Sequence, residues 1–283
     1  MEIQSSSTSF LQHPFDGMAE FYDADFTRTP LGRRKRALVH RYLETILQPN
    51  WNVLELNCGT GEDALWLSQR TKNVIATDIS AKMVEVAEAK IRENGAENVR
   101  FNRMGIEDLW GESSPSPHIS SQRFNLVFSN FDGLNCLQDI ALLPPALNRL
   151  LSPNGEAVFV LMSRFCALET VAELLRGNLQ NAFQRSRGEG RPIHIGNDLR
   201  VDTWFHPTRK ILRLFRQNGF HVKGVRAIGL TTPPTSLRDF YHRHIRTFQR
   251  FDKIEERLSL YYPFNRMGDH LLVHVRKSGR VYE

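Results

Sequence analysis

Cysteine is scarce in this chain, with three among 283 residues. Cys58, Cys136 and Cys166 are odd in number and lack C-x-x-C spacing, which argues against a disulfide framework and against a zinc site. Long apolar runs are also missing, since none approaches the ~20 residues that span a bilayer. The stretch MEIQSSSTSF lacks the basic start and apolar core of a secretory signal. We therefore expect a cytoplasmic protein with no metal and no membrane span.

Neither sign of charge dominates the chain. Its 37 basic and 31 acidic residues give a net charge of +6, which is compatible with nucleic acid, anionic lipid or an acidic small substrate and selects none of them. The densest basic run, 33–36, has the spacing of a helix face. A solvated face is its plainest interpretation, and contacts with an anionic substrate or product, or with nucleic acid, are the alternatives. No RNP-type aromatic motif or zinc finger supports nucleic-acid binding.

The first two thirds of the chain alternate strand-like and helix-like segments. Residues 1–14 are rich in Ser and Thr without apolar periodicity and predict a flexible tail. The helices that we expect cover 15–25, 31–47, 63–68, 83–91 and 140–151, and the strands cover 51–56, 73–78, 98–102, 124–129 and 156–162. Strict alternation requires crossover connections, so the sequence predicts a doubly wound α/β domain with a mostly parallel sheet.

Two segments interrupt this alternation in the last third. The insert 165–206 contains a helix at 167–175 and then a Gly-rich, basic stretch that is only weakly strand-like. The mixed region 235–266 lies between a strand at 220–228 and a final strand. Both would flank the carboxyl ends of the strands, where such folds bind ligands, so we interpret them as lids. The predicted single domain, 15–283, divides into N-terminal helices (15–50), a ligand-binding half (51–164), the helical and loop lid insert (165–206) and a C-terminal part (207–283).

The turn after the first strand has the pattern G-x-G-x-x-A, and Asp78 ends the next strand. Together they formally match a dinucleotide fingerprint. However, Glu55, Glu62 and Asp63 place carboxylates where a pyrophosphate needs the bare positive end of a helix. Such a site favours a cationic or zwitterionic ligand, and it makes a dinucleotide oxidoreductase the less favoured hypothesis.

The stretch E-L-N-C-G-T-G at 55–61 resembles the first motif of the class I S-adenosylmethionine-dependent methyltransferases, whose usual form is acid-x-G-x-G-x-G. The resemblance covers roughly residues 50–162 and continues more loosely to the final strand. It implies a seven-stranded sheet with the last strand antiparallel, S-adenosylmethionine as cofactor and S-adenosylhomocysteine as product. The sulfonium and ammonium of that cofactor suit an acidic rim.

The resemblance assigns roles to individual residues. Gly59 and Gly61 let the backbone approach the cofactor closely, because a Cβ would collide. Glu55 matches the motif acid that organises the amino-acid end, and Asp78 matches the carboxylate that accepts hydrogen bonds from both ribose hydroxyls. Asn57 replaces the first glycine, which asparagine tolerates because it visits the left-handed region readily, and its side chain is a further candidate contact.

On the adenine side, Gly105 stands where many members carry an acid for the amino group. That acid is therefore missing or is supplied by Glu107. The other expected neighbours of the adenine are Ile79, Met83 and the backbone of Gly105 and Ile106.

The stretch S-N-F-D-G-L-N at 129–135 follows the fourth strand, where the family places residues near the transferring methyl group. On this resemblance Asn130 and Phe131 are the candidate catalytic residues, with Asn130 also near the cofactor. Phe131 would wall the methyl pocket, and Asn135 would hydrogen-bond an acceptor. The alternative is that Phe131 belongs to the core and that the asparagines cap the following helix.

Further candidate contacts are spread along the chain. Tyr22 resembles a tyrosine that many small-molecule members place over the cofactor, and Arg33 would meet the cofactor carboxylate or an anionic substrate. Core packing accounts for the first equally well. The candidate acceptor contacts from the lid regions are Arg164, Glu169, His206 and Tyr241, for which an ion pair within the insert or ordinary packing is the alternative.

The sequence thus predicts an enzyme that methylates an oxygen or nitrogen atom of a small molecule, in a biosynthetic setting such as secondary metabolism. RNA or protein methylation is the second hypothesis, motivated by the basic balance of the chain. A non-catalytic binding module with the same fold is the third. A monomer and a homodimer both remain open.

Overall fold

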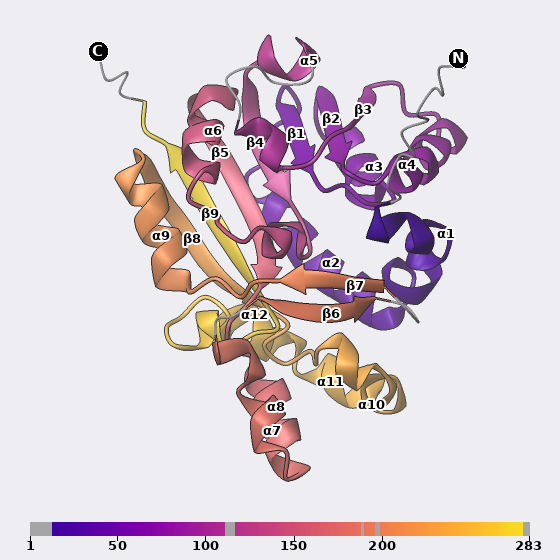
Figure 1. Ribbon diagram of the computed structural model, residues 1–283, viewed down its shortest axis with the longest axis vertical. Coiled ribbons are helices and arrows are strands. Elements are labelled where there is room, and N and C mark those ends of the chain that lie inside the picture. Colours follow the sequence, from indigo (N-terminus) through magenta and orange to yellow (C-terminus); the bar gives the residue numbers. More distant parts are fainter. Residues whose placement is uncertain (1–12, 111–116, 188–189, 196–198, 280–283) are drawn as a thin grey trace, which may run out of the picture.

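A seven-stranded sheet forms the centre of the computed structural model, which describes residues 13–110, 117–187, 190–195 and 199–279 (Figure 1). The strand order is β3-β2-β1-β4-β5-β9-β8, and only β9 runs antiparallel to its neighbours β5 and β8. The strands are β1 (Asn52–Leu56), β2 (Asn73–Asp78), β3 (Val99–Arg103), β4 (Phe124–Ser129), β5 (Leu151–Met162), β8 (Phe220–Ile228) and β9 (His270–Lys277). The predicted fold class is therefore confirmed.

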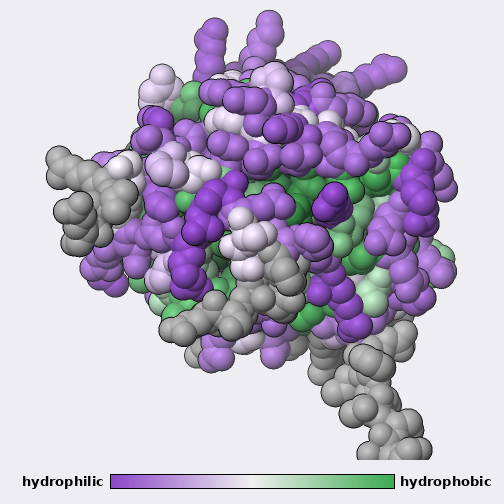
Figure 2. All heavy atoms as spheres, turned by 90° about the horizontal axis from the view of Figure 1, so that it is seen from above, coloured by the Kyte–Doolittle hydropathy of each residue, from purple (hydrophilic) through white to green (hydrophobic). Residues whose placement is uncertain are grey.

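Helices cover both faces of the sheet. On one face lie α2 (Pro30–Glu44), α3 (Glu62–Ser68) and α4 (Ala81–Glu93), and on the other α6 (Leu143–Leu150) and α9 (Thr208–Gln217). Figure 2, seen from above, shows hydrophilic side chains along one side of the visible face and a band of hydrophobic ones across its middle.

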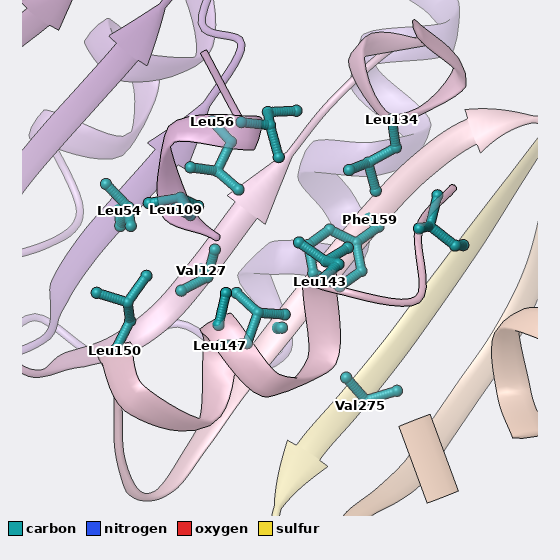
Figure 3. Packing of buried hydrophobic residues seen from close by; sticks show 14 of the residues in the cluster. Leu54, Leu56, Leu109, Val127, Leu134, Leu143, Leu147, Leu150, Phe159 and Val275 are labelled. Carbon is teal, nitrogen blue, oxygen red and sulfur yellow. The ribbon is translucent and has the colours of Figure 1, made fainter. Parts of the chain in front are cut away.

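On one face of the sheet, the hydrophobic core is formed by side chains of α6 that pack against side chains of β4 and β5. Leu143 and Leu147 of α6 point toward Val127 of β4 and Phe159 of β5 (Figure 3). Each of these side chains is almost fully buried, and burying one leucine contributes roughly 1.5–3 kcal/mol. This packing fixes β4 and β5 side by side, and so positions the loops at their carboxyl ends.

The N-terminal segment is helical, as predicted. The helices η1 (Pro14–Met18), α1 (Ala19–Tyr22) and η2 (Asp23–Thr27) precede α2, which begins at Pro30 because Thr29 caps it by accepting a hydrogen bond from the Gly32 amide. The interpretation of 33–36 as a solvated face is wrong for three of its four residues. Arg34, Lys35 and Arg36 are largely buried and take part in ion pairs, and only Arg33 is exposed.

The insert contains more strand than predicted. It consists of α7 (Ala167–Leu175), α8 (Leu179–Ala182), η5 (Gln184–Arg187) and an antiparallel hairpin of β6 (Arg191–Ile195) and β7 (Leu199–Thr203). The second lid region contains η6 (Thr235–Leu237), α10 (Arg238–Arg243), α11 (Ile245–Arg250), α12 (Asp252–Leu258) and η7 (Phe264–Arg266). Both lie at the end of the molecule toward which β4 and β5 point (Figure 1).

Three short elements complete the described chain: η3 (Glu107–Leu109), α5 (Pro117–Ser120) and η4 (Gly133–Cys136). Ile119 of α5 is fully buried. Most of the predicted tail lies outside the described residues. None of the helices that the structure describes has the length and apolarity to cross a membrane.

Candidate functional site

The turn after β1 is built from left-handed residues. Asn57 has φ of 51°, which confirms that asparagine stands in for glycine by adopting this conformation. Its side chain is committed within the protein, because Nδ2 donates to the Asn130 carbonyl at 2.9 Å and Oδ1 accepts from Ser129 Oγ at 2.5 Å. A Cβ at Gly133 would come within 2.1 Å of this side chain. Asn57 therefore ties the β1 turn to the end of β4.

The two glycines of the turn have different roles. A Cβ at Gly59 would meet no atom within 4 Å, so this left-handed residue borders open space. A Cβ at Gly61 would come within 2.8 Å of Ala87 Cβ on α4. Gly59 leaves room for a ligand, as predicted, whereas Gly61 is required for close packing of α3 against α4.

Asp78 faces the same turn from the end of β2. Its Oδ2 accepts a hydrogen bond from the Gly59 amide at 2.8 Å, and its Oδ1 accepts one from the Ser80 amide at 2.9 Å. Burial raises the pKa of Asp78, and these two amides act against that rise. Each carboxylate oxygen has a second lone pair, so the group retains acceptor capacity toward hydroxyls of a ligand.

The predicted adenine neighbours are only partly brought together. A Cβ at Gly105 would lie 3.3 Å from Ile79 Cδ1, and Ile79 is exposed, so these two border one surface. Met83 and Ile106 are buried. The Gly105 amide donates to Asp108 Oδ2 at 2.8 Å, and Glu107 is exposed. Two acids are thus present beside Gly105, because Glu107 Oε2 and Asp108 Oδ2 would each lie 3.5 Å from a Cβ there, and Asp108 also bonds the amide.

The acidic rim is largely neutralised by the protein itself. Glu62 pairs with Lys90 at 3.1 Å, and Asp63 pairs with Arg36 and lies 2.6 Å from His40 Nε2. Burial would raise the pKa of Asp63, but Arg36 and His40 outweigh it and hold that pKa below its usual range. Asp63 is thus engaged within the protein, whereas the Glu62 side chain stays 39% exposed.

Glu55 is the remaining carboxylate of the rim. It is fully buried, and its Oε2 has no hydrogen-bond partner among the described residues. Burial, and then the nearby Asp63, raises the pKa of Glu55 well above its usual range. A buried carboxyl oxygen without a partner is costly unless something else supplies a donor.

Phe131 is enclosed by groups from three parts of the chain. The Arg36 guanidinium lies 5.1 Å from the centre of its ring, and the rings of Phe26 and His270 approach it edge-on at 5.4 Å. Phe131 and Asp132 have φ of 49° and 73°, two consecutive non-glycine residues in the left-handed region. Such backbone costs roughly 1–3 kcal/mol per residue and gathers at functional sites.

Asn130 and Tyr22 also reach this enclosure. Asn130 Nδ2 donates to Asp63 Oδ2 at 2.9 Å, whereas its buried Oδ1 has no hydrogen-bond partner among the described residues. Burial raises the pKa of the Tyr22 hydroxyl, on which Arg36 and Asp132 also act. Tyr22 thus lies near these charged groups, and its ring centre also lies 5.7 Å from that of Phe26, as the core-packing alternative predicts. Arg36, one turn after the predicted Arg33, supplies the guanidinium here.

Residues 53–155 match the family model described as a methyltransferase domain. The chain contains a methyltransferase domain. Its fold is that of the class I S-adenosylmethionine-dependent methyltransferases, as the resemblance predicted. The DhpI-SAH complex structure aligns with a TM-score of 0.57 at 17% identity and covers 94% of each chain. An S-adenosylmethionine-dependent methyltransferase from Clostridium acetobutylicum aligns with a TM-score of 0.56 at 13% identity, over 94% of this chain and all of that one.

Among curated proteins, a tRNA/tmRNA (uracil-C(5))-methyltransferase from Pseudomonas putida is 35% identical over 80 residues. The match covers 28% of this chain and 22% of that relative. This similarity is therefore limited to part of the methyltransferase domain.

The lid residues that were predicted to contact an acceptor instead make contacts within the protein, which hold the lid regions in place. Arg164 donates to the Ser186 carbonyl at 2.6 Å, and Glu169 pairs with Arg185 at 2.5 Å, so the insert is held by these bonds and not by an Arg164–Glu169 pair. Tyr241 is buried, and its ring centre lies 5.2 Å from that of Phe248.

Asn135 and His206 are corrected in the same way. Asn135 is fully buried, with Oδ1 accepting from the Met162 amide at 2.7 Å and Nδ2 donating to the Trp204 carbonyl at 2.9 Å. It therefore ties the insert to the end of β5. His206 is buried with Nε2 3.0 Å from the Leu137 carbonyl, and burial lowers its pKa.

Sequence reasoning missed a buried charge network beside Phe131. Asp269 receives an ion pair from Lys35 and another from Arg185 at 2.7 Å, and its Oδ2 lies 3.1 Å from His270 Nδ1. On its other side, His270 Nε2 lies 3.0 Å from Asp132 Oδ1. The network thus joins α2, the insert and β9 to the residue that follows Phe131.

The charge of His270 links this network to pH. Burial lowers the pKa of His270, but Asp132 and Asp269 outweigh it and raise that pKa from 6.5 to about 9. A raised folded pKa means stability that is complete below pH 6.5 and is lost as the pH rises through about 9. We expect urea unfolding to show a loss of roughly 3 kcal/mol across this window.

The control for this prediction is a pair of substitutions. His270→Gln should remove the loss in this window, whereas His221→Gln, at an exposed position on β8, should retain it. An identical pH dependence in the His270→Gln variant and the unmodified protein would contradict the assignment.

Proposed function

We propose that this protein transfers a methyl group from S-adenosylmethionine to an oxygen or nitrogen atom of a small-molecule acceptor. The observation that supports this most is the open space at Gly59 beside the Asp78 carboxylate. Buried polar atoms without partners among the described residues, at the ends of β1 and β4 and on α2, add to this support. These groups fit the cofactor: a close backbone approach, an acceptor for ribose hydroxyls, and donors and acceptors for an amino acid. When bound, the cofactor supplies an electrophilic methyl on a sulfonium.

We assign the amino-acid end to three residues around the β1 and β4 turns. Arg36 Nε, Glu55 Oε2 and Asn130 Oδ1 are all buried and lack hydrogen-bond partners among the described residues. Arg36 suits the carboxylate of the cofactor, and the two acceptor oxygens suit its ammonium. Asp78 would hold the ribose hydroxyls, with Ile79 and Gly105 beside the adenine.

On the acceptor side, Phe131 forms the wall and Asp132 supplies a polar group. The Asp132 side chain is 39% exposed and therefore accessible, and its Oδ1 lies 3.0 Å from His270 Nε2. The bound cofactor would supply the methyl group. A hydroxyl of the acceptor would form the new bond to the methyl carbon while the carbon–sulfur bond breaks and leaves its electron pair on sulfur, and the hydroxyl would release its proton. We propose that the Asp132 carboxylate accepts this proton, since alignment and proton removal are what the chain must supply.

A small molecule is the favoured acceptor because the insert and the second lid region are braced at the carboxyl ends of the strands. Methylation of carbon through thiolate addition has less support. Burial raises the pKa of all three cysteines, to about 12 for Cys136 and Cys166, which suppresses the thiolate. The three thiols are free, which suits the cytoplasmic location that we propose.

RNA methylation is the second candidate, supported by the partial similarity to the tRNA/tmRNA methyltransferase. The test is incorporation of label from methyl-tritiated S-adenosylmethionine into bulk tRNA and, separately, into a library of small hydroxyl and amine compounds. Labelling of small compounds alone supports the proposal. Labelled tRNA, with binding that falls steeply as salt rises, would replace it with the RNA hypothesis.

Asp78→Ala should weaken binding of S-adenosylhomocysteine by about 1.5–3 kcal/mol, the range for hydrogen bonds to a charged group. Calorimetric titration measures this as a rise in Kd of roughly ten- to hundredfold. Asp139→Ala is the comparison and should leave Kd unchanged, because its carboxylate is 62% exposed and lies 3.5 Å from Lys210. An unchanged Kd in Asp78→Ala would mean that the ribose does not lie there.

A further inference from the structure

Exposed hydrophobic side chains gather on the two lid regions. Among the described residues, five large hydrophobic side chains are exposed on the insert and seven on region 235–266, against three elsewhere. Those of the insert are Val171, Leu174, Leu175, Leu179 and Phe183, and those of the second region are Phe240, Phe251, Ile254, Leu260, Tyr261, Tyr262 and Phe264. Single exposed hydrophobic residues need no explanation, but their concentration in two segments at one end of the molecule is typical of an interaction surface.

The exposed hydrophobic side chains of the insert lie mainly on α7 and α8, which together form the α7–α8 arm. Val171, Leu174 and Leu175 are spaced three and four residues apart and therefore share one face of α7. Leu175 is 84% exposed, and Leu179 at the start of α8 is 67% exposed. Figure 1 shows this arm projecting away from the sheet, at the same end of the molecule as α10, α11 and α12.

Basic residues accompany these hydrophobic ones. The exposed cations of the second region are Arg238, Arg243, Arg246, Arg250, Lys253 and Arg257. Its described acids offset them little, because Glu255 is buried, Glu256 pairs with Arg41 at 3.0 Å, and only Asp239 is fully exposed. The surface is thus apolar and cationic together.

We propose that these two lid regions form a docking surface for an anionic lipid bilayer. Leucine and aromatic side chains enter the boundary between headgroups and acyl chains, while arginines bind anionic headgroups, so both features of the surface are used. Tyr261 and Tyr262, 65% and 69% exposed, are the residue type that favours this boundary.

Other occupants use only part of this surface. A two-fold dimer through this face would bring the same arginines of both copies together, which costs energy. Nucleic acid would use the cations and the aromatic rings but would leave Leu175 and Leu179 without a partner. The bilayer is the partner that matches the aliphatic, aromatic and basic residues at once.

The experiment is sedimentation with sucrose-loaded vesicles, made of phosphatidylglycerol mixed with phosphatidylcholine or of phosphatidylcholine alone. We expect partitioning onto the anionic vesicles to exceed that onto neutral ones by about tenfold or more. The double substitution Leu175→Ser with Leu179→Ser should reduce it by about tenfold. The matched control, Leu142→Ser, removes an exposed leucine outside the lid regions and should leave it unchanged.

Charge is tested by two variants with equal change in net charge. Arg246→Glu with Arg250→Glu, on one face of α11, should reduce anionic binding by about tenfold. Arg213→Glu with Arg216→Glu, exposed on α9, should reduce it far less. Equal losses in both pairs, or no sedimentation with either vesicle, would overturn the proposal.

Light scattering after size-exclusion chromatography measures the oligomeric state and tests whether this surface binds a second copy of the chain. A dimer that the leucine substitutions dissociate, without vesicle binding, would make this face a self-association surface and would also overturn the proposal. Titration with S-adenosylhomocysteine separates the two ideas, because the lid variants should keep cofactor binding. Loss of cofactor binding in the unmodified protein would count against the proposed function and not against docking.

Discussion

Replacing Asp269 with alanine is expected to lower the free energy of unfolding by about 3–5 kcal/mol, the cost of breaking a buried ion pair by removing one partner. Asp269 is fully buried and faces Lys35, Arg185 and His270. Burial would raise its pKa, but these cations, Lys35 first, hold it well below the usual range. Without the carboxylate, buried positive charges remain unpaired.

Urea unfolding followed by circular dichroism measures this loss. Asp139→Ala is the matched control, because its carboxylate is 62% exposed and lies 3.5 Å from Lys210. An exposed pair of that kind contributes about 1 kcal/mol or less. A loss of that small size in Asp269→Ala as well would contradict the buried network described here.

Replacing Gly59 with valine is expected to abolish binding of S-adenosylhomocysteine, with Kd rising more than about hundredfold. The Cβ would project into the space that we assign to the cofactor, and the φ of 54° would add backbone strain. A control must separate the effect of backbone strain from that of a steric collision between the valine side chain and the ligand. Gly95→Val is the control, because Gly95 has φ of 65° and equally open surroundings in the loop after α4.

The control should lose stability to a similar degree and keep full binding. Both variants are compared by thermal unfolding and by calorimetric titration. Equal binding by Gly59→Val and Gly95→Val would show that the open space at Gly59 is not where the ligand lies.

Strands that are flanked by clear turn-forming residues could be predicted from the sequence. The predicted and observed bounds agree for β2, β4 and β8, because each apolar run is delimited by polar or glycine-containing turns. The hairpin of β6 and β7 was only weakly indicated, since its sequence is basic and interrupted by glycine. Its strands pair with each other, and such pairing is not visible in the periodicity of either strand alone.

The residues of the candidate site also differ in whether the sequence alone could reveal them. Asn57 and Gly59 lie in the turn after β1, and Asp78 ends β2, so a local motif was enough to find them. Arg36 and Asp269 belong to segments far apart in the chain, and only tertiary packing brings them to Phe131. The prediction that Asn135 contacts an acceptor failed for the opposite reason, because a buried amide can be saturated by backbone groups.

One available signal pointed to the missed network. Asp269 precedes the last strand and His270 begins it, and this strand was predicted to be antiparallel. An antiparallel strand begins at the edge of the sheet where the parallel strands end. Polar residues at that start therefore belong beside the loops after β1 and β4, and topology alone would have placed them there.

The central claim is that the turn at Gly59 binds S-adenosylmethionine and its product. Calorimetric titration of the unmodified protein with S-adenosylhomocysteine, and in parallel with NAD, tests this most directly. We predict micromolar binding of S-adenosylhomocysteine and no binding of NAD. Binding of NAD would favour a dinucleotide oxidoreductase, and binding of neither would favour a non-catalytic module; either result would contradict the proposed function.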